Sequence, residues 1–129
     1  MKKILLIALI IFSFSLSANA QRIILKSYGV VAEDSNGKQE FSDDAEIHLN
    51  FNNNTLTIFR TDNNELYEFI SLINSGETNE FYILDYRASI GKLPCNITIL
   101  SSKNKNLTII IIDIGSMKLS YYTEFKQTI

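Results

Sequence analysis

The residues with the most versatile side-chain chemistry in this chain are its one histidine and the acids near it. His48 lies two residues after Glu46, and Asp43 and Asp44 come shortly before both. One imidazole with two carboxylates could ligate a transition metal. The spacing matches no metal-binding signature, however, and a histidine beside acids on the polar face of a strand is usually a solvated pair. We therefore expect no metal site here.

The turn-forming segment Asp34-Ser35-Asn36-Gly37 looks at first like the opening of a calcium loop. Such a loop alternates acidic or amide ligands and places glycine at its sixth position. Here Gln39 holds the sixth position and the glycine comes two residues early. We interpret the segment as a tight turn, because Asn36-Gly37 can adopt positive φ.

Nucleophilic catalysis needs a nucleophile, a base and a third group that orients the base. No serine lies in a G-x-S-x-G pattern, no glycine-rich phosphate loop is present, and pairing Cys95 with His48 would rest only on each being unique. A single cysteine excludes an intramolecular disulfide, and free cysteines are usually small buried hydrophobes. We expect Cys95 to be buried, and we expect a protein that is not an enzyme and uses no cofactor.

Tyrosines give the one positive indication of binding. Tyr82, Tyr86, Tyr121 and Tyr122 lie in expected strands, where an amphipathic ring can line a pocket mouth or an exposed patch. Tyrosine is also common in half-buried strands, which is the competing interpretation. These four residues are the candidate ligand-binding set.

The first 20 residues have the pattern of a secretory signal peptide. Two lysines precede an apolar run at residues 4–12, and Ser17-Ala18-Asn19-Ala20 supplies an A-x-A cleavage site. The run is shorter than the about 20 apolar residues of a transmembrane helix. We predict cleavage after Ala20, export to the periplasm or the cell exterior, and no stable membrane insertion of the mature chain.

Residues 21–129 are expected to form a single domain, because this length supports one core. The whole chain has a formal net charge of −2, and no basic run follows the predicted signal peptide. Nucleic acid is therefore not an expected partner, since phosphate binding needs a clustered positive face.

Composition beyond residue 20 is typical of an all-β protein. The chain has one proline and five glycines, and β-branched and aromatic residues recur in short runs between Asn, Asp, Gly and Ser clusters. The expected strands cover residues 22–33, 38–41, 45–51, 55–60, 66–73, 80–87, 96–101, 107–114 and 118–125. The run at 66–73 fits neither the strand period nor the helix period cleanly. Residues 88–94 are expected to form a loop.

This pattern favours an antiparallel meander of about seven or eight short strands, in a compact barrel or strongly coiled sheet. A β-sandwich is the alternative. The clearest hairpin joins residues 45–51 to residues 55–60, where apolar and polar residues alternate. Two runs, at 80–87 and 107–114, are apolar on both faces, and 107–114 is the best candidate for a central strand covered on both sides.

Several of these runs together resemble small exported meander β proteins of Bacteroidetes-type bacteria. The runs are residues 44–51, 56–59, 67–70, 95–100, 107–109 and 121–122. The resemblance implies a lipocalin-like or otherwise meandering β fold, and it carries over no functional residues because no activity is assigned to that group. We expect a non-catalytic binding module for a small apolar ligand or a protein partner. The alternative is a structural or envelope-associated component without a ligand pocket.

Overall fold

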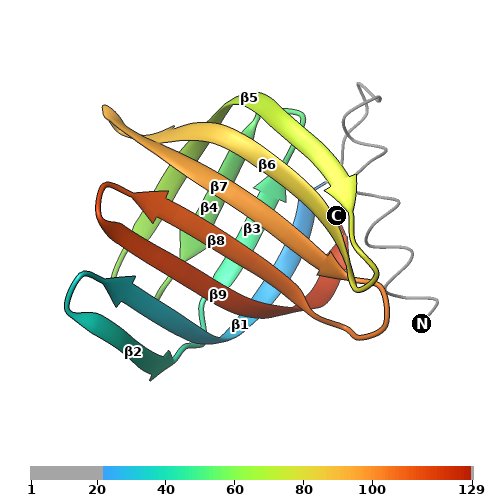
Figure 1. Ribbon diagram of the computed structural model, residues 1–129, viewed down its shortest axis with the longest axis horizontal. Helices are drawn as coiled ribbons and strands as arrows, with labels where there is room; N and C mark the ends of the chain where they lie inside the picture. The colour runs from blue at the N-terminus through green and yellow to red at the C-terminus, as the bar shows by residue number, and fades with distance from the viewer. Residues whose placement is uncertain (1–21, 129) are drawn as a thin grey trace.

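The computed structural model describes residues 22–128, which form nine antiparallel β-strands and no helix (Figure 1). The strands are β1 (Arg22–Asp34), β2 (Gly37–Ser42), β3 (Glu46–Asn50), β4 (Thr55–Phe59), β5 (Asn64–Glu77), β6 (Phe81–Ile90), β7 (Leu93–Ser102), β8 (Thr108–Ile114) and β9 (Met117–Thr128). Their order in the sheet is β2-β1-β3-β4-β5-β6-β7-β8-β9, and β1 also pairs with β9. That last pairing closes eight strands into a barrel and leaves β2 outside it.

The predicted all-β meander in a compact barrel is confirmed, and the alternative sandwich is not observed among the described residues. There are nine strands rather than seven or eight, and some are long, with 13 residues in β1 and 14 in β5. The predicted hairpin of β3 and β4 is present, with Leu49 opposite Leu56. The predicted signal peptide at residues 1–20 lies outside the described part of the chain.

The predicted loop at residues 88–94 was wrong. β6 continues to Ile90 and β7 begins at Leu93, so only Gly91 and Lys92 form the turn. Gly91 has a φ of 60°, a conformation that glycine adopts without steric cost. Pro94 is tolerated in β7 because the pairing of β7 with β8 starts only at Asn96, so its missing N–H faces an edge without a partner strand.

Inward-facing side chains fill the barrel. Along the strands that form the barrel, alternate residues point inwards, as expected for a pleated strand in a closed sheet. The largest fully buried side chains are those of Tyr67, Tyr121, Ile23, Leu25, Ile47, Leu49, Leu56, Ile58, Ile97, Ile99 and Ile110. These side chains form one close-packed core, which stabilises the barrel by burial of apolar surface.

The expectation that residues 107–114 and 80–87 are covered on both faces was also wrong. β8 does lie between β7 and β9, but its side chains alternate between fully buried Ile110 and Ile112 and half-buried Ile109 and Ile111. β6 alternates in the same way. In a barrel a strand has the core on one side only, and neighbouring strands rather than a second layer satisfy its backbone groups.

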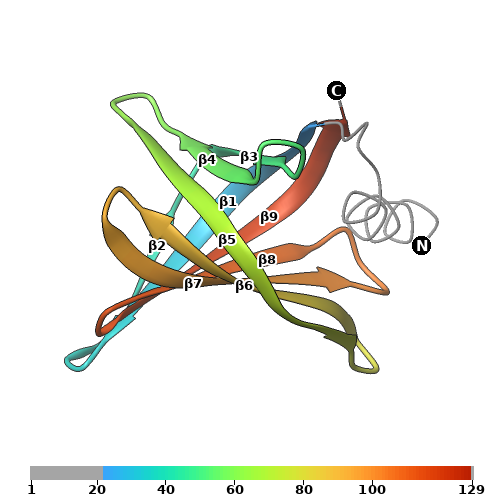
Figure 2. The same cartoon turned by 90° about the horizontal axis from the view of Figure 1, so that it is seen from above.

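Two long strands change partners along their length. β1 pairs with β3 over Arg22–Lys26 and then with β2 over Gly29–Asp34. β5 pairs with β4 over Asn64–Glu68 and with β6 over Glu68–Glu77. β3 and β4 have five residues each, so the second half of β5 runs on past the end of β4, as the view from above shows (Figure 2).

Candidate functional site

A hollow of about 320 Å³ opens where β5 leaves β4, beside the β3–β4 turn. Its lining comes from the β3–β4 turn, β5 and β6, and consists of Phe51, Asn54, Phe69, Ile70, Ser71, Leu72 and Tyr86. Asn54 has a left-handed φ of 57°, and its carbonyl accepts a hydrogen bond of 2.7 Å from the Phe69 N–H. Beyond that bond, no strand within residues 22–128 pairs with β5 on the β4 side.

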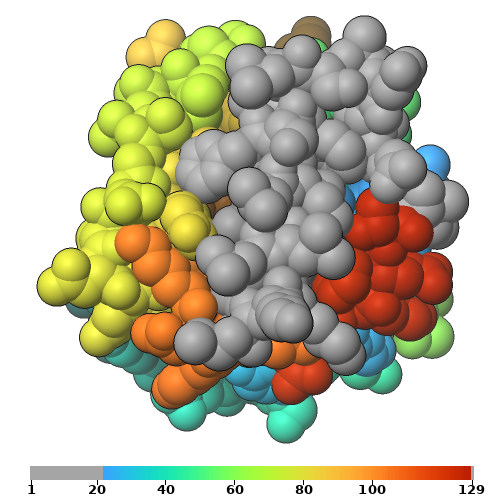
Figure 3. Space-filling model, turned by 90° about the vertical axis from the view of Figure 1, so that its right-hand side faces the viewer, coloured from blue at the N-terminus to red at the C-terminus, as the bar shows by residue number. Residues whose placement is uncertain are grey.

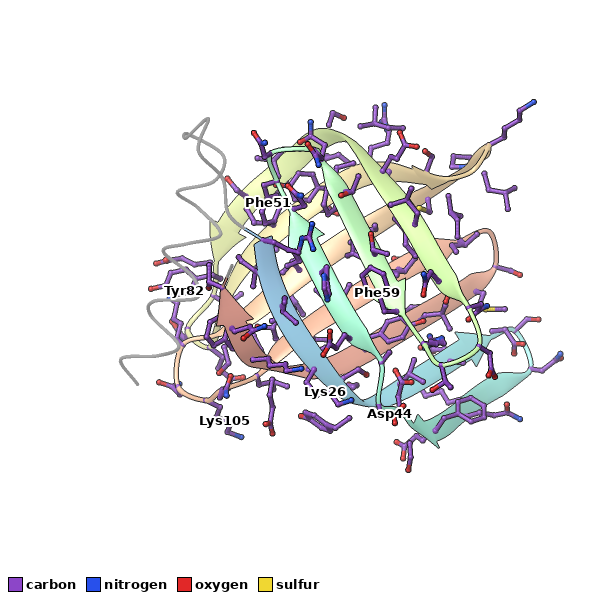
Figure 4. The ribbon with its side chains drawn as sticks, turned by 180° about the vertical axis from the view of Figure 1, so that it is seen from behind. Lys26, Asp44, Phe51, Phe59, Tyr82 and Lys105 are labelled. Carbon is purple, nitrogen blue, oxygen red and sulfur yellow. The ribbon has the colours of Figure 1, made fainter. Side chains whose placement is uncertain are left out.

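Three aromatic rings form the floor of the hollow. The ring centroids of Phe69 and Tyr86 lie 4.4 Å apart, and Phe51 stacks on Phe69 at 5.7 Å with an angle of 8° between the planes. All three residues are buried, and Figure 4 shows Phe51 at the end of β3. Burial raises the pKa of Tyr86, so its phenol is neutral at physiological pH. The floor is therefore apolar and held by ring packing.

Three apolar residues of β5 are exposed here: Ile70 and Leu72 line the hollow, and Ile73 is the next residue along the strand. Ile70 is 61% exposed, Ile73 is 50% exposed and Leu72 is 43% exposed. Leu72 lies opposite Tyr86 in the β5–β6 register, so the two side chains share the inward face of the sheet. An inward-facing leucine with this exposure shows that the barrel wall is open at this point. Single exposed apolar residues are ordinary, but three within four positions form a patch.

Of the four tyrosines predicted from sequence, only Tyr86 lines this hollow. Tyr121 is 2% exposed and lies in the core. Tyr122, the next residue, lies on the outer face and borders a separate hollow of about 210 Å³ together with Tyr28 and Phe41. The structure therefore does not bring the four tyrosines into one site.

The β5–β6 turn lies beside the β7–β8 loop at one end of the molecule (Figure 3), and Tyr82, near the start of β6, lies at the same end (Figure 4). The Lys103 N–H donates a hydrogen bond of 2.8 Å to the Glu80 carbonyl and ties the two connections together. The Lys103 ammonium lies 5.0 Å from the centre of the Tyr82 ring and 3.5 Å from a Glu77 carboxylate oxygen. Tyr82 thus contributes to a link between two loops.

Tyr121 belongs to a polar network at the β4–β5 end of the barrel. Arg60 Nη2 donates a hydrogen bond of 2.8 Å to the Tyr121 hydroxyl, and Nη1 lies 3.3 Å from Asp43 Oδ1. Glu65 lies 3.5 Å from the same guanidinium, and Ser27 Oγ donates to Asp43 at 2.8 Å. Each charge has a partner, so we assign this network to closing the barrel end rather than to ligand binding.

His48 pairs with Glu46 as expected, since its Nε2 lies 3.0 Å from Glu46 Oε1, but its side chain is only 14% exposed and is therefore not fully solvated. Its ring contacts Phe59 at a centroid distance of 4.5 Å, and Glu46 also bonds to Lys126. Asp43 lies in the Arg60 network instead. The described part of the chain contains no group of three His, Cys, Asp or Glu side chains that could hold a metal ion.

The other two candidates from the sequence have structural roles. Cys95 is buried, as predicted, and burial raises the pKa of its thiol. The segment at residues 34–37 is a turn, also as predicted, in which Asp34 Oδ1 accepts a hydrogen bond of 2.8 Å from the Asn36 N–H. Positive φ occurs at Gly37 but not at Asn36.

Sequence reasoning missed Phe51, Phe69, Ile70 and Leu72. The available sign was the broken alternation of residues 66–73, because the β5–β6 register shifts between Phe69 and Ser71 and again between Leu72 and Asn74. A register shift of this kind is a β-bulge, which bends a strand and re-aims its side chains.

No protein-family model matches this chain, and no curated protein or solved structure matches it either. Within residues 22–128 there is no helix that is long and apolar enough to cross a membrane.

Proposed function

We propose that this chain is an exported, non-catalytic binding module that holds an extended segment of a protein partner along the open edge of β5. The observation that carries the proposal is the coincidence of three features. The second half of β5 lacks a partner strand on the β4 side, it borders the aromatic hollow, and it exposes Ile70, Leu72 and Ile73.

The backbone of β5 supplies the first part of the interaction. An unpaired strand edge presents N–H and C=O groups that an added strand can satisfy. In strand addition these main-chain hydrogen bonds give affinity, and pockets for individual side chains give specificity. The β3–β4 turn limits where an added strand can pair with β5, because the Phe69 N–H already donates its hydrogen bond to the Asn54 carbonyl.

The hollow supplies the second part. Its floor of Phe51, Phe69 and Tyr86 suits one apolar side chain of the partner, and its volume of about 320 Å³ is open to solvent. The barrel interior is filled by the core, which supports a protein partner over a small apolar ligand held inside the barrel. A structural component without a pocket would not require this open hollow.

Selection of peptides from a displayed random library tests the proposal. We expect enriched peptides with an apolar or aromatic residue, and a Leu72→Asp variant should bind them about tenfold more weakly, since a buried apolar contact is lost. Leu66→Asp is the matched control, because Leu66 lies on the half of β5 that β4 pairs with and is 50% exposed. Peptide binding should also slow amide hydrogen exchange within residues 70–77, which follow the Phe69 N–H that already bonds to Asn54.

Two results would count against the proposal. One is a set of peptides whose binding is weakened equally by both leucine variants. The other comes from native mass spectrometry of the protein purified from its own host. An extra small-molecule mass that disappears on denaturation would favour an apolar ligand over a protein partner.

A further inference from the structure

β2 is a second open edge, separate from the β5 site. It pairs only with the second half of β1, stands outside the closed barrel, and is exposed at all six residues (Figure 1). No other strand of the described chain lies along its far side. Exposed edges of this kind accept further strands unless their side chains prevent it.

The hairpin register determines which backbone groups of β2 are free. Asp34 and Gly37 flank the two-residue turn and pair with each other. The pair next to such a turn is hydrogen-bonded, and bonded and non-bonded pairs then alternate. Gln39 therefore bonds to β1, whereas Lys38 and Glu40 direct their N–H and C=O groups to the open edge.

The same two residues carry opposite charges on one face of β2, because they are two positions apart. If two copies of β2 align antiparallel with Gln39 opposite Gln39, each Lys38 faces the Glu40 of the other copy. A shift of the strands in one direction places Lys38 opposite Lys38, and a shift in the other places Glu40 opposite Glu40. Like charges directly opposite one another are unfavourable.

We propose that two copies of this chain associate through their β2 edges in this one register. The two Lys38–Glu40 pairs are then also the hydrogen-bonded pairs, so four backbone hydrogen bonds and two ion pairs form around a two-fold axis at Gln39. If Lys38 and Glu40 carried charges of the same sign, they would repel a second copy of β2. Alternating signs select a second copy of β2 and exclude the shifted registers.

The association is weak and salt-sensitive. A six-residue edge buries far less than the roughly 1,200 Å² of a stable interface, and exposed ion pairs are screened by salt. This interaction is independent of the proposed function, because β5 and its hollow stay open in the dimer.

Sedimentation velocity over a concentration series at low salt tests the inference. We expect a monomer–dimer equilibrium, with dissociation constants about tenfold higher for Lys38→Glu and for Glu40→Lys, since each variant turns two attractive pairs into repulsive ones. The double variant K38E/E40K should regain the affinity of the unmodified chain. An equimolar mixture of the two single variants should form a heterodimer, because each supplies the charge that the other lacks.

Lys92→Glu is the matched control, because it makes the same charge change at the exposed β6–β7 turn and should leave the dissociation constant unchanged. A chain that stays monomeric at all concentrations would overturn the inference. So would a dimer that withstands both single variants, or a double variant that stays as weak as the single ones.

Discussion

Arg60 Nη2 donates a hydrogen bond of 2.8 Å to the Tyr121 hydroxyl across 61 positions of sequence, and the guanidinium lies 5.5 Å from the centre of the same ring. The contact joins the end of β4 to the middle of β9. β4 and β9 are not neighbours in the closed sheet, so this contact adds a link across the barrel that strand pairing alone does not supply.

Replacing Arg60 with alanine should destabilise the protein by about 2 kcal/mol, because Asp43 and Glu65 would keep their charges without a cationic partner in a half-buried site. Tyr121→Phe removes one hydrogen-bond acceptor and should cost about 1 kcal/mol. Urea unfolding of both variants gives the two free energies. An Arg60→Ala variant as stable as the unmodified chain would mean that the network does not hold the barrel closed.

The ion pair on the outer face predicts an acid-dependent loss of stability. A hydrogen bond from Lys126, and then one from His48, lowers the pKa of Glu46 from 4.5 to about 2. A carboxyl whose pKa is lowered by folding stabilises the folded state at pH values above its pKa in the unfolded chain. This contribution is lost as the pH falls from 4.5 towards 2. The urea midpoint of Glu46→Gln should therefore lie below that of the unmodified chain at pH 6. The two midpoints should converge near pH 2, and a constant difference across this range would contradict the assignment.

The thiol of Cys95 should react slowly in the folded protein. It is 6% exposed, and burial raises its pKa, so little of the reactive thiolate is present at neutral pH. Labelling with a thiol reagent should be slow in buffer and fast in denaturant. Fast labelling without denaturant would show that the β7 end of the core opens readily.

The strands that could be predicted from the sequence are those with one face on the core and one face towards water along their whole length. The β3–β4 hairpin alternates regularly because one face of each strand lies over the core and the other faces water. The turn at Gly91-Lys92 was not predicted, because proline normally interrupts a strand. Pro94 fits into β7 only because β8 does not extend far enough to pair with it. The edge that tolerates Pro94 is a property of the sheet, not of the local sequence.

Most residues of the candidate site could not be predicted from the sequence, because their positions also depend on how the strands pair. A tyrosine lines the hollow, lies in the core or faces water according to the face of the sheet from which its side chain projects. A register shift exchanges the inward and outward faces for the residues that follow it in the strand. The shifts in β5 near Ile70 and Ile73 arise from its pairing with β6. Tyr86 could therefore be proposed as a binding residue, but its neighbours Phe51 and Phe69 could not.

The last prediction concerns two hydroxyl groups inside the barrel. Ser101 and Thr108 are cross-strand neighbours on β7 and β8, and their hydroxyl oxygens are buried without a hydrogen-bond partner among the described residues. A buried polar group without a partner costs about 1–3 kcal/mol. Thr108→Val keeps the side-chain shape and removes this cost, so it should leave the free energy of unfolding unchanged or raise it by about 1 kcal/mol.

Thr123→Val is the matched comparison. The Thr123 hydroxyl donates a hydrogen bond of 2.6 Å to the Thr108 carbonyl, so its removal should lower the free energy of unfolding by about 1 kcal/mol. Thermal and urea unfolding should therefore show that Thr123→Val lowers the free energy of unfolding and that Thr108→Val does not. If Thr108→Val proved as destabilising as Thr123→Val, the Thr108 hydroxyl would have to bond to an internal water, which would make this part of the core a hydrated site.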